Sequence, residues 1–90
     1  MRRQVQYADE FVKRFRELSY GQRRFVEDSI RKMLSAEDPT LLAHHLERRE
    51  YFCSWNHRVR ANLIVVFRIS KNALTFLSTG THSEAYRPKP

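Results

Sequence analysis

An almost unbroken run of apolar and β-branched residues occupies positions 63–69, which read Leu63-Ile64-Val65-Val66-Phe67-Arg68-Ile69. A run of this length and composition is typical of a buried β-strand. The apolar stretch Leu74–Leu77 follows after the four residues 70–73, a spacing that predicts a tight antiparallel hairpin. Period-two alternation around Tyr51, Cys53 and Trp55 predicts another strand before this pair. The second half of the chain is therefore expected to form a sheet.

The first half has the periodicity of helices. Apolar residues recur every three or four positions in two stripes, which are Phe11, Phe15 and Leu18, then Val26, Ile30 and Met33. Ser19 and Gln22 have the spacing of a capping box, which predicts that a second helix begins near Tyr20. Pro39 disfavours helical geometry at the residue before it, so this helix should end by Glu37.

A weak alternation over Arg3–Tyr7 predicts a strand before the first helix. The expected order is strand, helix, helix, strand, strand, strand. This is an α+β domain with a two-helix hairpin on one face of a four-stranded, mainly antiparallel sheet whose other face stays open. Residues 1–90 should form a single domain, with 85–90 as a flexible tail. His44 and His45 are expected in the loop that enters the sheet, His57 on its first long strand, and His82 after its last.

Positive charge is concentrated in the second half of the chain. The formal net charge is +7, and residues 44–90 carry eight Lys and Arg against three Asp and Glu, whereas residues 1–43 carry nine against seven. All four histidines also fall in the second half. This surplus is expected for a protein that meets a phosphate backbone or an acidic partner, and a basic surface kept for solubility is the plainer alternative. The surplus residues are Arg48, Arg49, Arg58, Arg60, Arg68, Lys71, Arg87 and Lys89.

Several classes of protein are disfavoured by the composition. The longest uncharged stretch, 61–67, is far shorter than the roughly 20 apolar residues of a membrane span, and the first residues lack the apolar core of a signal peptide. We therefore expect a cytoplasmic protein with no membrane contact. Cys53 is the only cysteine, so it has no partner for an internal disulfide or for the usual structural zinc patterns. No cofactor or metal is expected.

The segment Ser78–Tyr86 carries the candidate chemistry. His82 and Tyr86 lie four positions apart, directly after the last apolar strand. RNA supplies its own nucleophile, the 2′-hydroxyl, so cleavage needs a base, an acid and cations around the phosphorus. Histidine suits both proton roles because its reference pKa is about 6.5. Arg58 and Arg60, two positions apart on a strand, are expected to share a face and stabilise the phosphorane jointly.

The chain resembles a known family in four places. These are the segment Ala43-His44-His45-Leu46, the later His57, the strand Leu63–Phe67 with Arg68, and the block Thr79-Gly80-Thr81-His82-Ser83-Glu84-Ala85-Tyr86. Together they look like the RelE superfamily of toxin ribonucleases, specifically its YafQ branch. The resemblance spans the chain and implies a small basic toxin of a type II toxin-antitoxin pair. Such a toxin enters the ribosomal A site, cuts messenger RNA there, and forms a hetero-oligomer with an acidic antitoxin.

The resemblance also implies roles for individual residues. His44, His57 and His82 take the places of the branch's three active-site histidines, and Tyr86 that of an aromatic or catalytic tyrosine. The match needs one extra residue after His57, so Arg58 is an alternative to His57 for the second active-site position. His45 is likewise an alternative to His44 for the first. On charge, the candidates for substrate binding are Arg48, Arg49, Arg58, Arg60 and Arg87. No metal ligand is assigned.

Two departures from the branch leave a second hypothesis open. Asn62-Leu63 stands where the branch has an Asp-Trp pair, and Ile64 where many relatives carry an arginine. The first hypothesis is a ribosome-dependent endoribonuclease that leaves a 2′,3′-cyclic phosphate. The alternative is a toxin that acts by binding a protein, as ParE relatives do with gyrase, or a weakened homologue.

Overall fold

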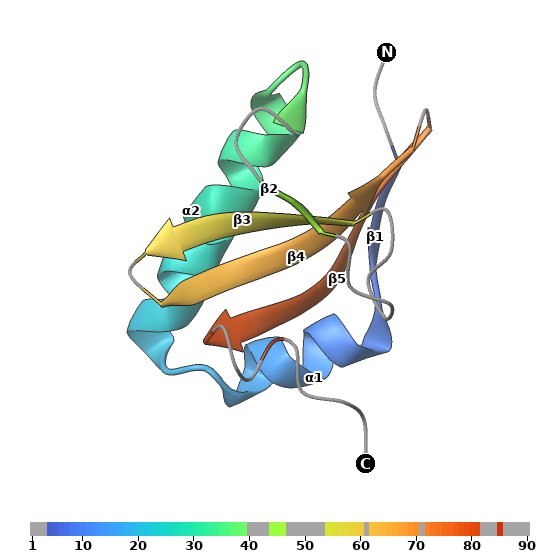
Figure 1. The fold of residues 1–90 in the computed structure, drawn as a ribbon. Coiled ribbons are helices and arrows are strands. Elements are labelled where there is room, and N and C mark those ends of the chain that lie inside the picture. Colours follow the sequence, from blue (N-terminus) through green and yellow to red (C-terminus); the bar gives the residue numbers. More distant parts are fainter. Residues whose placement is uncertain are drawn as a thin grey trace.

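The computed structural model describes residues 4–39, 44–46, 54–60, 62–70, 72–81 and 85, with the backbone alone for 44–46 and 54–57 (Figure 1). Two helices, α1 (Asp9–Glu17) and α2 (Tyr20–Ser35), follow strand β1 (Gln4–Tyr7). The remaining strands are β2 (His44–Leu46), β3 (Ser54–Arg60), β4 (Leu63–Ile69) and β5 (Ala73–Thr81). They form one sheet in the order β1-β5-β4-β3-β2. Only β1 and β5 run parallel among these described pairs.

Local sequence signals set the bounds of α2. The backbone N–H of Gln22 donates to Ser19 Oγ at 3.2 Å, and the N–H of Ser19 donates to Gln22 Oε1 at 3.0 Å, so the predicted capping box is present. The helix ends at Ser35, before the predicted limit at Glu37. Among the described residues, no helix has the length and apolar character needed to cross a membrane.

The main core lies between the helices and one face of the sheet. The apolar stripes of α1 and α2 supply Phe11, Val26, Ile30 and Met33, which pack with alternate residues of β4 and β5. Figure 1 shows both helices on the same side of the sheet. The strand partners in this cluster are Leu63, Val65, Phe67, Leu74 and Phe76. The predicted α+β architecture, with a helical hairpin on one face of a mainly antiparallel sheet, is confirmed.

The sheet has one more strand than the sequence predicted. His44 pairs with Asn56 and His45 with Trp55 in an antiparallel ladder, so both histidines belong to β2 and the expectation of a loop there is wrong. The strand is only three residues long, which is too short to show a period in the sequence. Its formation depends on the neighbouring edge of β3.

The sequence predicted that the face of the sheet away from the helices stays open. The structure shows that this face is partly covered. Ile64 and Val66 are buried there against Ala85, with the partly buried Leu77 beside them. Ala85 is 0% exposed, so the domain includes this residue, which the sequence had assigned to the flexible tail. The cause is the composition of β4: five consecutive buried residues, 63–67, require cover on both faces.

Candidate functional site

The strand register brings the candidate residues of β2 and β3 into rows that end on β5. We call a row the set of residues that lie directly opposite one another on neighbouring strands. One row joins His44, Asn56, Val66 and Ser78. The next contains His57, Val65 and Thr79, and the one after it Arg58, Ile64 and Gly80. Because neighbouring strands are about 4.8 Å apart, β3 and β5 are separated by about 10 Å.

These rows alternate between the two faces of the sheet. Val66 and Ile64 are buried on the face away from the helices, whereas Val65 belongs to the core beneath them. The row of His44 and the row of Arg58 therefore share the face away from the helices. The described side chains in the row of residue 57, Val65 and Thr79, lie on the helix side. Of the two alternatives for the second active-site position, Arg58 is the one whose row shares a face with the row of His44.

Arg58 and Arg60 do not share a face, and that expectation is wrong. The ladder between β3 and β4 shifts between them, because Arg58 pairs with Ile64 while Arg60 pairs with Leu63. This β-bulge puts Val59 and Arg60 together on the helix side, where Val59 packs against the core. The guanidinium carbon of Arg60 lies over the Phe25 ring of α2, 4.3 Å from its centroid. Among the residues that the structure describes, Arg58 is the exposed cation on the other face at this end of β3.

The end of β5 is held by buried polar contacts. Ser78 Oγ donates to the carbonyl of Ala85 at 2.9 Å, and Thr79 Oγ1 donates to the carbonyl of Ile64 at 2.9 Å. Gly80 has φ 133°, a conformation that L-residues rarely adopt. The strand continues to Thr81, so the first residues of the predicted chemical block are structural. Sequence reasoning missed Ser78, although a buried serine that follows an apolar strand needs a hydrogen-bond partner.

A small pocket lies on the helix side of this strand end. It is lined by Arg14, Glu17, Leu18, Gln22, Thr79 and Gly80, and its volume is about 70 Å³. Sites for small-molecule ligands usually have several hundred cubic ångströms, so this pocket cannot hold a nucleotide. Arg14 Nε lies 2.9 Å from Glu10 Oε1, and the two side chains are only 14% and 16% exposed. The pocket is part of the packing between the helices and β5.

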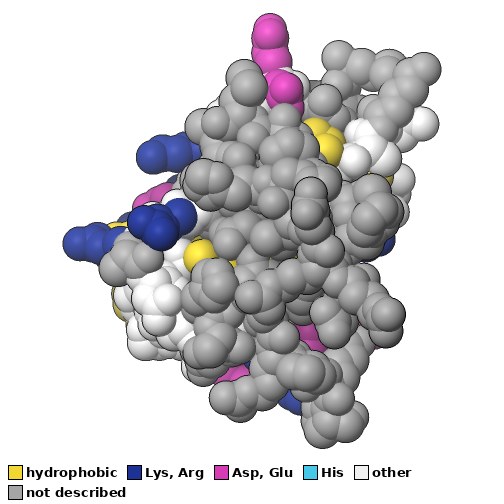
Figure 2. Space-filling model, in the orientation of Figure 1, with side chains coloured by type: hydrophobic (Ala, Val, Ile, Leu, Met, Phe, Trp, Pro, Cys, Tyr) yellow, Lys and Arg dark blue, Asp and Glu magenta, His cyan; other side chains and the backbone are white. Residues whose placement is uncertain are grey.

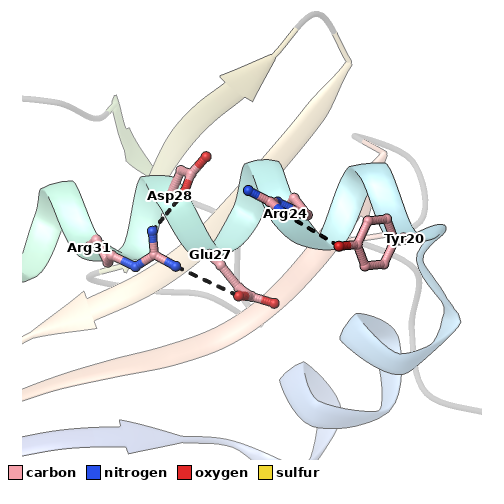
Figure 3. A network of polar contacts seen from close by, with 5 residues as sticks. All are labelled: Tyr20, Arg24, Glu27, Asp28 and Arg31. Atoms are coloured by element: carbon pink, nitrogen blue, oxygen red, sulfur yellow. Dashed lines mark hydrogen bonds and ion pairs between the residues drawn. The ribbon is translucent and has the colours of Figure 1, made fainter.

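Polar contacts join several charged side chains on the outer face of α2 (Figure 3). Arg31 lies 2.9 Å from Asp28 and 3.9 Å from Glu27, and Arg24 donates to the hydroxyl of Tyr20 at 3.4 Å. These groups are exposed, so each ion pair contributes at most about 1 kcal/mol. The predicted interleaving of charge on solvated helix faces is confirmed. Figure 2 shows described Lys and Arg side chains together on the side of the molecule where β3 ends.

The other candidates lie outside what the structure describes. This holds for Arg48, Arg49, His82, Tyr86 and Arg87, and for the side chains of His44 and His57. Their assignments stay predictions. What the described residues contribute is the position of their neighbours: β2 and β3 place residues 44 and 57 on adjacent strands, and β5 leads directly to residue 82.

Known structures share this fold. YafQ from E. coli strain BL21(DE3) superimposes with a TM-score of 0.66 at 16% identity, over 94% of this chain and 99% of that one. A chain of the RelB-RelE antitoxin-toxin complex from Methanococcus jannaschii gives 0.67 at 16% identity, over 91% and 95%. The chain has the RelE/YafQ toxin fold. The YoeB/ParE toxin from Agrobacterium tumefaciens also matches, with a TM-score of 0.66 at 15% identity, over 88% and 98%. No protein-family model and no curated protein matches the sequence.

Within the RelE/YafQ fold, this chain uses the start of β4 for packing. Leu63 is 6% exposed in the core under the helices, and Ile64 is 3% exposed on the opposite face. Asn62 is exposed in the turn that precedes them. Neither Leu63 nor Ile64 presents a polar group to solvent, so these two residues of β4 offer no side-chain chemistry.

Proposed function

We propose that this chain is the toxin of a type II toxin-antitoxin pair and that it cleaves messenger RNA on the ribosome. The observation that carries the proposal is the likeness to YafQ, which covers 94% of this chain. In this chain β5 leads into the block Thr79-Gly80-Thr81-His82 on which the resemblance depends. The net charge of +7 suits both a phosphate backbone and an acidic partner.

The proposed reaction is an attack of the RNA 2′-oxygen on the adjacent phosphorus. A base takes the proton of the 2′-hydroxyl, the 2′-oxygen bonds to phosphorus, and the bond from phosphorus to the 5′-oxygen breaks. An acid then protonates the departing 5′-oxygen, leaving a 2′,3′-cyclic phosphate and a 5′-hydroxyl. His44 and His82 are the proposed proton carriers. His57 is the other histidine that the resemblance implies, and we assign its place to Arg58, whose row shares a face with the row of His44. Each such transfer is worth typically 10²- to 10⁴-fold in rate.

Arg58 is the proposed phosphate ligand on the sheet. Arg58 is exposed and lies in one row with Ile64 and Gly80. Arg60, in contrast, packs on the ring of Phe25. A guanidinium in this position stabilises the charge that develops on the phosphorane. Arg48, Arg49 and Arg87 remain candidates for contacts along the RNA backbone, and Tyr86 for a hydrogen bond or a stacking surface.

The proposed partners are the ribosome with its message and an acidic antitoxin. RelE of Methanococcus jannaschii was crystallised with the antitoxin RelB, and this chain superimposes on 95% of the matched chain of that complex. A neighbouring gene for a short acidic protein would agree with this pairing. The chain is expected to act in the cytoplasm, where ribosomes are.

The burial of Leu63 and Ile64 favours a second candidate function. These residues stand where relatives place a stacking ring and an arginine, and here both side chains lie inside the domain. A chain that lacks these groups is either a slower nuclease or a toxin that acts by binding a protein target. The YoeB/ParE toxin of Agrobacterium tumefaciens shows the same fold.

A translating extract separates the two functions. Wild-type protein and the variants His82→Ala and Arg16→Ala are added, and the ends of the message are mapped. The proposal expects cuts in register with codons for the wild type and for Arg16→Ala, which removes an exposed cation on α1, and no cuts for His82→Ala. Intact message in all three reactions, with altered DNA supercoiling in a gyrase assay, would establish the ParE-like alternative instead.

A further inference from the structure

One buried hydrogen bond joins the end of β5 to the chain that follows it. Ser78 Oγ donates to the backbone carbonyl of Ala85 at 2.9 Å, across seven positions of sequence. Both residues are 0% exposed. The intervening positions, 79–84, include His82, and Tyr86 comes directly after Ala85.

A β-bulge on β5 builds the seat for Ala85. Val66 pairs with Ser78 and Phe67 with Phe76, so Leu77 is an extra residue between two regular pairs. A bulge of this kind turns two consecutive side chains to one face of the sheet. Leu77 joins the cluster of Ile64 and Val66, and Ser78 presents its hydroxyl beside them. The methyl group of Ala85 therefore packs against Ile64, Val66 and Leu77, while its carbonyl accepts a hydrogen bond from the Ser78 hydroxyl.

One further contact and one unusual backbone angle lie in the strand next to this site. Thr79 Oγ1 donates to the carbonyl of Ile64 at 2.9 Å, and this bond is also buried. Gly80 adopts φ 133°, which directs the chain along a path that other residues rarely follow. Both features belong to the strand itself, and neither involves Ala85.

We propose that Ser78 and Ala85 form a clasp that positions the two ends of the segment carrying His82. The catalytic part of this inference rests on the proposed function, whereas the clasp itself is a property of the fold. Ser78 and Ala85 are positioning residues, because they hold the chain on either side of His82 and in front of Tyr86. Loss of the contact between Ser78 and Ala85 removes one constraint on the two ends of the segment 79–84.

The test compares two buried hydroxyls that each donate to a carbonyl at 2.9 Å. Ser78→Ala removes the bond to Ala85, and Thr79→Val removes the bond to Ile64 while leaving the clasp. Amide hydrogen exchange is measured on peptides that cover positions 82–86. In Ser78→Ala, exchange at these positions should rise about tenfold or more, as expected for local opening, and it should stay at the wild-type rate in Thr79→Val. Equal protection in both variants would overturn the clasp.

Cleavage kinetics test the catalytic part. Ser78→Ala should lower kcat about 10- to 100-fold with little change in KM, because small displacements of a catalytic group have effects of this size. Ser78→Thr keeps a hydroxyl, so its kcat should be close to that of the wild type. The kcat of Thr79→Val should stay within about twofold of the wild type. If the kcat of Ser78→Ala equals that of Thr79→Val while exchange differs, the clasp has no part in catalysis.

Two controls keep these outcomes separate. If Ser78→Ala does not fold, Ala85→Gly removes the methyl contact and adds backbone freedom at the same position, so exchange should rise at positions 82–86. No rise would overturn the clasp. If the wild type cleaves no RNA, the proposed function fails while the exchange measurement still decides the clasp.

Discussion

Arg60 stacks on Phe25, with 4.3 Å between the guanidinium carbon and the ring centroid. The contact joins the end of β3 to α2, beside Val59, which packs against the core that α2 helps to form. It also removes Arg60 from the set of cations that face away from the helices. A residue that looked like a substrate ligand by its position in the sequence is therefore part of the packing of the domain.

The stacking of Arg60 on Phe25 should be measurable as a coupling energy. Phe25 is 39% exposed, so the pair is expected to contribute about 0.5–1 kcal/mol. Urea unfolding of Phe25→Leu, Arg60→Gln and the double variant gives this value as a double-mutant cycle. Additive effects of the two single variants, with no coupling, would contradict the contact.

Arg58 and His57 should differ in their effect on message cleavage. If Arg58 stabilises the phosphorane, Arg58→Ala lowers the single-turnover rate about 10²-fold or more. His57→Ala should have the smaller effect, because the described side chains of its row, Val65 and Thr79, lie on the helix side. Arg16→Ala serves as the charge control. A larger loss for His57→Ala than for Arg58→Ala would return the second active-site position to the histidine.

The two glycines should respond oppositely to alanine. Gly80 has φ 133°, and a Cβ there introduces backbone strain of about 1–3 kcal/mol. Gly21 lies in α2 with no atom within 4 Å of an added Cβ, so Gly21→Ala should raise the free energy of unfolding by about 0.5–1 kcal/mol. Thermal unfolding of both variants checks the signs. Stabilisation by Gly80→Ala would be inconsistent with the observed backbone.

The capping box should account for part of the stability of α2. Ser19→Ala removes the oxygen that accepts from the Gln22 N–H and should cost about 1 kcal/mol in the free energy of unfolding. Ser19→Gly, which keeps a residue tolerated at this position, should cost only a few tenths. Chemical denaturation of the two variants is the measurement, and equal costs would show that the side-chain bond contributes little.

Local signals in the sequence were enough to predict both helices and the hairpin of β4 and β5. The capping box marks the start of α2, and the apolar stripes mark the faces that α1 and α2 bury. Ser70 N–H donates to the Ala73 carbonyl at 2.8 Å in the predicted tight connection. These features depend on residues within a few positions of one another, so they can be read from one chain.

Features that depend on pairing between distant strands were not predicted. The three residues of β2 show no period of their own, and the parallel pairing of β1 with β5 joins residues about 70 positions apart. The bulge at Arg58–Arg60 shifts the register by one residue, which exchanges the two faces of the sheet for every side chain beyond it. Alternation along β3 alone therefore assigned Arg60 to the wrong face.

By itself, the sequence determined the α+β class, the positions of the helices and the segment in which the candidate histidine and tyrosine occur. The tertiary structure alone decided that Arg58 and Arg60 separate and that Ala85 is buried against Ser78. The physical reason is that local hydrogen bonds and apolar periodicity set each element, whereas register shifts and cover for a strand buried on both faces are settled only when the strands pair.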